Sequence, residues 1–276
     1  MISTKFVSAA VFAGSVFATG LASAATLVTM APGATNGLGV NGVVSTTQGE
    51  FQTVGMSTDL FSTLTINGNS GVASFSEIGT INATQFFGNS NTVVNSGVNS
   101  NYKIQGTFSL TGLGAWSGSI YNAAPGSVSF SVNLFAVSDT NQTIQLGTAT
   151  LNNASSLVGF AVAFGSVANG STGTALTSLS SVLDFTPAAG TTGADGFFKA
   201  PTPFNISFAV GNAGGNQFNT AYSVSPTGVV TIVTPTAGNN PGTANITFVN
   251  TVPEPGALAL AGLALFGVAA ARRKTK

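Results

Sequence analysis

The sequence contains no cysteine and no histidine. Without cysteine the chain forms no disulfide bond, and without either residue it cannot build the usual zinc sites or a histidine-dependent catalytic triad. Charged residues are also scarce, at 5% of 276 residues compared with about 25% in average proteins. Seven basic residues are matched by seven acidic ones, which gives no basic surface for nucleic acid. We therefore expect no cofactor, no metal site and no nucleic-acid partner.

The N-terminal segment has the three parts of a secretory signal peptide. Lys5 supplies a positive charge, residues 6–21 form an uncharged apolar run, and Ala22 and Ala24 supply an A-x-A cleavage site. This order predicts that residues 1–24 form a signal helix, which signal peptidase removes to leave Ala25 as the first mature residue. A buried N-terminal helix is the alternative interpretation.

The C-terminal segment predicts a short membrane helix. Pro253 and Pro255 prevent a helix from starting earlier, and residues 257–271 are an unbroken run of small and apolar residues. A helix of this length measures roughly 22 Å, which is shorter than a hydrocarbon core of about 30 Å. The basic end that follows, residues 272–276, contains Arg272, Arg273 and Lys274. The positive-inside rule keeps this end in the cytoplasm and places the preceding chain outside.

Together, Val252, Pro253, Glu254 and Pro255, the short apolar helix and the basic end resemble the PEP-CTERM protein-sorting tail. The resemblance covers residues 252–276. It implies a Gram-negative host that makes exopolysaccharide, and an inner-membrane-anchored precursor from which an exosortase removes the tail. The mature protein would then reach the cell surface or the extracellular matrix. An ordinary C-terminal anchor is the alternative.

The exported part, residues 25–251, predicts one β-rich domain. It contains two lysines and six carboxylates, a net charge of −4. Apolar and polar residues alternate with period two, as in half-buried strands, and turn signals such as Asn-Gly and Pro-Gly separate the runs. The clearest runs are residues 107–110, 127–134, 143–146, 205–208 and 245–248. The pattern predicts an all-β, antiparallel sandwich or jelly roll with hydroxyl and amide groups on its polar face.

Four elements follow one another within residues 105–225: SVNLFA at 131–136, LGTA at 146–149, LDFTP at 183–187 and GFFKAPTPF at 196–204. Their order resembles that of flocculation-associated PEP-CTERM proteins. This second resemblance implies a secreted protein that helps to bind cells and exopolysaccharide into flocs. In the last element we expect a strand that ends at two prolines, with Phe197, Phe198 and Phe204 packed into the core.

Three candidate sites have ordinary structural alternatives. Asp184 and Asp195 are a possible glycosidase pair, although an Asp before Gly is typical of a turn. Asp139 offers an oxygen ligand for calcium but has the setting of a hairpin loop. Trp116 and Tyr121 could stack on sugar rings, although strand aromatics more commonly pack in the core.

The sequence therefore predicts a non-enzymatic cell-surface or matrix protein that is sorted by an exosortase and supports flocs or biofilm with exopolysaccharide. Its expected partners are the exosortase, signal peptidase, exopolysaccharide and, transiently, the inner membrane. A secreted carbohydrate-binding or carbohydrate-active protein, with Asp184 and Asp195 as a hydrolase pair, is the alternative.

Overall fold

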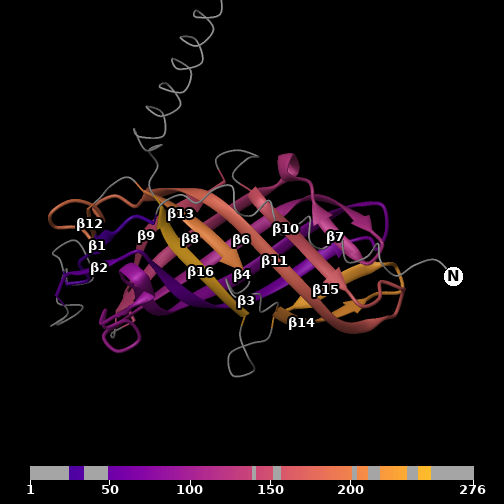
Figure 1. Cartoon of the computed structure of the whole chain (residues 1–276), viewed down its shortest axis with the longest axis horizontal. Helices are drawn as coiled ribbons and strands as arrows, with labels where there is room; N and C mark the ends of the chain where they lie inside the picture. The colour runs from indigo at the N-terminus through magenta and orange to yellow at the C-terminus, as the bar shows by residue number, and fades with distance from the viewer. Residues whose placement is uncertain are drawn as a thin grey trace, which may run out of the picture.

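The computed structural model describes residues 25–33, 49–138, 141–151, 157–200, 204–210, 218–234 and 242–249. These residues form a body of antiparallel strands, which confirms the predicted all-β fold class (Figure 1). The signal helix predicted within residues 1–24 and the helix predicted at 257–271 lie outside the described residues. Within the described ranges, no helix is long and apolar enough to cross a membrane.

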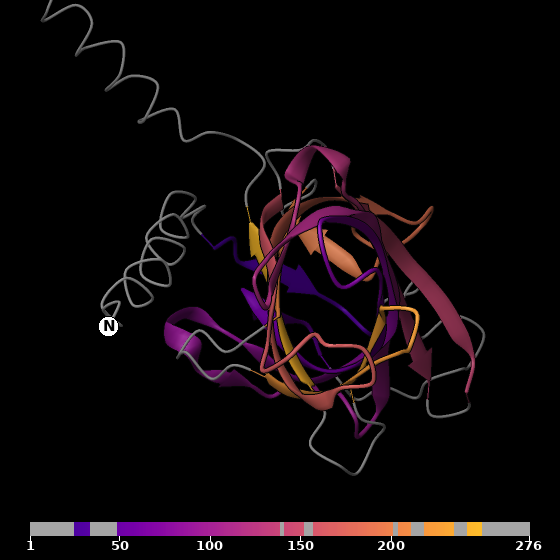
Figure 2. The ribbon, with the colours of Figure 1, turned by 90° about the vertical axis from the view of Figure 1, so that its right-hand side faces the viewer.

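The main sheet closes on itself into a ring with eight positions, seen end-on in Figure 2. Four positions hold one long strand each: β3 (Gly55–Asn67), β4 (Val72–Phe87), β6 (Tyr102–Ser117) and β11 (Thr172–Pro187). The other four hold two shorter strands placed end to end: β8 (Ser129–Ser138) with β7 (Ile120–Ala123), β9 (Thr143–Thr150) with β10 (Leu157–Phe164), β13 (Asn205–Val210) with β14 (Phe218–Val224), and β16 (Gly242–Val249) with β15 (Val229–Val233).

Every pairing around the ring is antiparallel. The order is β3, β4, β6, β8/β7, β9/β10, β11, β13/β14, β16/β15 and back to β3. Strands on opposite sides of the ring pack against one common core, as the two sheets of a sandwich do. Unlike the sheets of a sandwich, the two sides are joined by continuous strand pairing. Phe108 on β6, for example, lies 6.0 Å from Phe208 on β13, measured between ring centroids.

A smaller three-stranded sheet, in the order β12, β1, β2, lies at one end of the ring (left in Figure 1). Its strands are β1 (Val28–Met30), β2 (Phe51–Thr53) and β12 (Phe198–Ala200). Beyond these, β5 (Val93–Val94) pairs with the end of β4, and two 3-10 turns occupy Asn89–Asn91 (η3) and Pro125–Ser127 (η4).

Apolar residues of the alternating runs point into the ring, and the polar residues between them point outward. On β8, Phe130, Val132 and Leu134 are at most 2% exposed, whereas the residues between them face outward. The other four alternating runs lie within β6, β9, β13 and β16. Phe197, Phe198 and Phe204 are also buried, which confirms the packing predicted for the GFFKAPTPF segment.

Glycines on the inner face make room for large aromatic side chains. A Cβ atom on Gly79 would lie 2.5 Å from the ring of Phe108, and one on Gly114 would lie 2.5 Å from the ring of Tyr121. Such contacts are much shorter than normal van der Waals separations. Aromatic rings of the core therefore occupy the space that a side chain at Gly79 or Gly114 would need.

Candidate functional site: the paired chain ends and the outer wall

The predicted mature N-terminus lies beside the last strand of the body. Ala25 forms an antiparallel bridge with Val249, and the backbone N–H of Thr26 donates to the carbonyl oxygen of Phe248 at 2.7 Å. Val249 is the last residue of β16, and it is also in register with Asn205 on β13. The two ends of the body are thus joined within one sheet. We call this arrangement the paired ends.

Most of the predicted processing residues flank the paired ends. Ala22 and Ala24 come just before Ala25, and the segment Val252–Pro255 begins three residues after Val249. These residues, and the basic end with Arg272, Arg273 and Lys274, lie outside the described residues. Their roles stay predictions, as do the domain limits at residues 24, 25, 251 and 252.

A second feature is the outward side of β4, β6, β8 and β9, which we call the outer wall. These four strands contain two charged residues: Glu77, which faces the interior, and Lys103, near the start of β6. The remaining outward positions are mostly serine, threonine, asparagine and glutamine. One row crosses the outer wall in register and continues onto β11: Thr80, Thr107, Asn133, Thr148 and Thr186.

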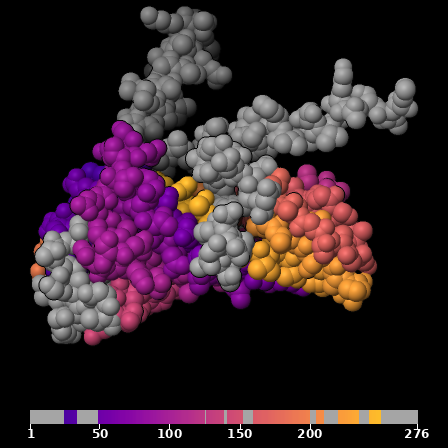
Figure 3. Space-filling model, turned by 90° about the horizontal axis from the view of Figure 1, so that it is seen from below, coloured from indigo at the N-terminus to yellow at the C-terminus, as the bar shows by residue number. Residues whose placement is uncertain are grey.

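Neighbouring polar side chains on the outer wall bond to one another. The amide of Gln105 donates to the side-chain oxygen of Asn82 at 3.1 Å. The hydroxyl of Thr148 donates to the side-chain oxygen of Asn133 at 2.9 Å. These bonds hold some side chains in place while leaving other donors and acceptors free toward solvent. In the view from below, residues from the first half of the chain gather at one end of the surface, with β14 and β15 in orange toward the other (Figure 3).

Tyr121 belongs to the core, and Trp116 is partly buried and packs against that core. Tyr121 is fully buried, and its hydroxyl donates to the carbonyl oxygen of Ala73 at 2.7 Å. The indole N–H of Trp116 donates to the carbonyl oxygen of Gly68 at 2.9 Å. Its ring also packs against Tyr121 and Phe164, each at a centroid distance of 5.2 Å. The packing alternative for this pair is therefore the correct one.

The two candidate catalytic carboxylates occupy different settings. Asp184 lies on the outward side of β11, in register with Asn205 and Thr150. Asp195 is exposed in the turn before β12. Asp139 lies outside the described residues. Within the described part of the chain, no three carboxylates gather as a metal site would require.

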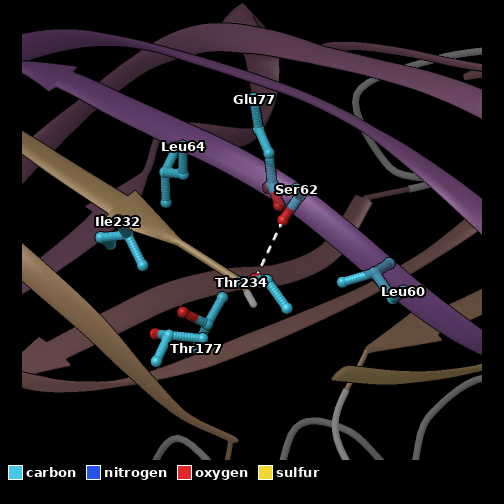
Figure 4. A pocket seen from close by; sticks show the side chains of 8 residues that line it. Leu60, Ser62, Leu64, Glu77, Thr177, Ile232 and Thr234 are labelled. Carbon is cyan, nitrogen blue, oxygen red and sulfur yellow. Dashed lines mark hydrogen bonds between the residues drawn. The ribbon is translucent and has the colours of Figure 1, made fainter. Parts of the chain in front are cut away.

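Glu77 is a buried acid that the sequence analysis did not single out. It occupies an inner position of β4, between Phe75 and Gly79, and is 6% exposed. The alternation Ala-x-Phe-x-Glu-x-Gly-x-Ile over residues 73–81 is the signal that identifies its face. Its carboxyl group lies beside Ser62, whose hydroxyl is 3.1 Å from that of Thr234 (Figure 4).

Burial controls the acidity of Glu77. Removal from water raises the pKa of Glu77 to about 7, and the hydrogen bond with Ser62 partly opposes this rise. The adjoining cavity leaves about 10 Å³ for the centre of a water molecule, enough for about one water. Its lining includes no basic side chain that could pair with the carboxylate: Leu60, Ser62, Leu64, Glu77, Thr177, Thr220, Ile232 and Thr234.

Comparison with known proteins identifies one family feature. Residues 251–274 match the PEP-CTERM protein-sorting motif, so the chain carries this motif at its C-terminus. The motif marks an exported, membrane-anchored precursor that is targeted to an exosortase. No curated protein and no solved structure matches the chain. The resemblance of the body to flocculation-associated proteins stays a prediction.

Proposed function

We propose that the exported body is a non-enzymatic protein of the cell surface or extracellular matrix, which supports flocs or biofilm by binding exopolysaccharide through the outer wall. The observation that carries this proposal is the row of uncharged hydroxyl and amide groups across β4, β6, β8 and β9. The absence of cysteine and histidine supports a non-enzymatic role, because it removes the commonest catalytic nucleophile–base pairs.

The chemistry of the outer wall suits a polymer of sugar hydroxyls. Such a polymer exchanges hydrogen bonds with side chains that both donate and accept, and serine, threonine, asparagine and glutamine all do so. Two half-buried aromatic residues border the polar rows: Phe61 is in register with Thr80, and Phe135 with Gln105. Each contact is weak, so strong binding requires many copies on one polymer. Low charge also reduces repulsion between neighbouring copies.

Deletion of the gene is expected to reduce the settling of cells and the mass of flocs or biofilm. The full-length chain should restore aggregation, whereas a chain lacking residues 252–276 should not, because it is not sorted. Settling rate and floc mass measure the effect. Unchanged aggregation in the deletion strain would contradict the proposed role, even if export and sorting proceed normally.

Removing hydroxyls from the outer wall is expected to weaken polysaccharide binding. The triple variant Thr80→Val, Thr107→Val and Thr148→Val keeps side-chain shape and strand propensity but loses three hydroxyls. At about 1 kcal/mol per lost hydrogen bond, each copy should bind on the order of 100-fold more weakly. Co-sedimentation of the full-length protein with exopolysaccharide purified from the host measures this loss.

The matched control places the same change on exposed positions outside the outer wall, as Thr172→Val, Thr174→Val and Thr243→Val. This control should bind like the unmodified chain, and both variants should unfold at similar urea concentrations. Equal binding by the outer-wall variant and its control would refute the assignment of the outer wall. If both variants lose binding to the same extent, the polysaccharide binds the polar surface of the whole body and not the outer wall in particular.

A further inference from the structure

The cavity beside Glu77 gathers oxygen-bearing side chains from four strands and the end of a fifth. Its polar lining residues all carry a hydroxyl or a carboxyl group: Ser62 on β3, Glu77 on β4, Thr177 on β11, Thr220 on β14 and Thr234 just after β15. Ser62, Thr220 and Thr234 are at most 7% exposed. Apart from Glu77, every polar group of this lining is therefore an uncharged hydroxyl, and most of them are buried in the ring.

The carboxyl group of Glu77 points into this cavity. Figure 4 shows the side chain reaching from β4 toward Ser62 and Thr234. Glu77 is 6% exposed, so more than nine-tenths of it is removed from water. It is in register with Leu64 on β3 and Leu110 on β6, which are both apolar. Neither of these neighbouring strands therefore places a charged side chain opposite the carboxyl group.

The described part of the chain offers no cationic side chain to this carboxylate. Its two lysines are Lys103, which is exposed on β6, and Lys199, which pairs with Glu50 at the surface. Hydroxyl groups can donate hydrogen bonds to a carboxylate but carry no positive charge. A buried charge is costly unless it is paired. One positive charge would balance the cavity, whereas a divalent ion would leave an unpaired charge of the opposite sign.

The hydroxyl oxygens of the cavity are suitable ligands for such an ion, because hard cations prefer oxygen. Each hydroxyl oxygen has two lone pairs. The hydroxyls of Ser62 and Thr234, 3.1 Å apart, share one hydrogen bond, which uses only one of their lone pairs. Thr220 donates its proton to the carbonyl oxygen of Ala175 at 3.2 Å, and this bond leaves its lone pairs unused. The space for about one water also fits a single monatomic ion.

We propose that this cavity binds one sodium or potassium ion. The carboxylate of Glu77 balances its charge. The hydroxyl oxygens of Ser62, Thr220 and Thr234 are further ligands. The lack of cysteine and histidine, from which we expected no metal site, excludes the sulfur and nitrogen ligands of zinc but not a site of this kind. The ion connects side chains of β3, β4, β14 and the end of β15, and so stabilises the folded ring.

Urea unfolding of the full-length protein in three salts tests this proposal. Fluorescence of Trp116 follows unfolding at about pH 8.5, in sodium chloride, potassium chloride or choline chloride at equal concentrations. At this pH Glu77 is ionised, because its pKa is about 7, and choline is too large for the cavity.

We expect at least one metal salt to raise the urea midpoint above its value in choline chloride, and the rise to saturate. At an ion concentration ten times the dissociation constant, the folding equilibrium constant should increase about 11-fold. Comparison of the sodium and potassium salts identifies which ion the cavity prefers.

Three variants locate the ion. Glu77→Gln keeps the size of the side chain but removes its charge, so its midpoint should no longer differ between the metal salt and choline chloride. The matched control, Glu50→Gln, removes a surface carboxylate and should keep the full difference. Thr234→Val removes one ligand oxygen while keeping the side-chain shape, so saturation should require a higher ion concentration.

Equal midpoints in the three salts would overturn the proposal. A metal-ion effect that persists in Glu77→Gln, or that disappears in Glu50→Gln, would place the ion outside this cavity and overturn it equally. Unchanged saturation in Thr234→Val would refute the ligand set. An occupied site offsets part of the cost of the buried charge. The unmodified protein and Glu77→Gln should therefore differ less in the stabilising salt than in choline chloride.

Discussion

Replacement of Phe198 by alanine is expected to lower the free energy of unfolding by about 3–5 kcal/mol. The Phe198 side chain is 2% exposed and contacts three other rings. The centroid distances are 5.4 Å to Phe185, 5.0 Å to Phe197 and 5.3 Å to Phe204. Alanine removes a buried ring and leaves a cavity that rigid neighbours cannot fill, so the loss of transfer free energy is increased by lost contacts.

This ring also links the small sheet to the end of the ring of strands. Phe198 lies on β12 in register with Met30 on β1, whereas Phe185 lies on β11 of the main sheet. Urea unfolding followed by fluorescence of Trp116, the single tryptophan, measures the effect. Trp116 packs with Phe164 on β10 of the main sheet, so its signal reports unfolding of the ring of strands.

Two control variants test whether the loss of stability comes from the buried ring of Phe198. Phe198→Leu keeps much of the buried volume and should cost clearly less than alanine. Phe61→Ala removes a ring of the same size from a half-buried outward position and should also cost less. If Phe198→Ala shifts the Trp116 transition by less than about 1 kcal/mol, the small sheet unfolds separately from the ring, and the aromatic cluster does not unite them.

Glu77→Gln is expected to stabilise the protein by about 3 kcal/mol above pH 7 and to leave it nearly unchanged below pH 4.5. The pKa of Glu77 rises from 4.5 to about 7 on folding. Below pH 4.5 the carboxyl is protonated in both the folded and the unfolded chain. Between pH 4.5 and 7 the unfolded chain releases its proton while the folded chain retains it, so stability falls as pH rises. Above pH 7 the loss is complete.

Glutamine imitates the neutral acid, because it keeps the size of the side chain and can still bond to Ser62. The variant should therefore lack the fall in stability between pH 4.5 and 7 that the unmodified protein shows. Urea unfolding at several pH values measures the difference. The matched control is Glu50→Gln, which removes a carboxylate that pairs with Lys199 at the surface. A fall that persists in Glu77→Gln but disappears in Glu50→Gln would contradict our account of Glu77.

Local sequence patterns determined the positions of several strands, the faces that they bury and the sorting motif. Strict alternation along residues 127–134 identified a strand and its inner face, because side chains on a strand point alternately to opposite sides. The burial of Phe197, Phe198 and Phe204 was predicted from a different local pattern, the aromatic segment GFFKAPTPF with its two prolines. The alternation along residues 73–81 also places Glu77 on the inner face of β4. The sorting motif was also readable, since its parts are contiguous in the chain.

Only the tertiary structure decided which strands pair. Residues 55–60 of β3 pair with β16, almost 190 positions later, and nothing local specifies that partner. Register and partner depend on how all faces are buried at once, which is why the closed ring and the division of four positions between two strands were not predicted. For the same reason, the complete burial of Tyr121 and the bridge between Ala25 and Val249 followed from the tertiary structure and not from a local pattern.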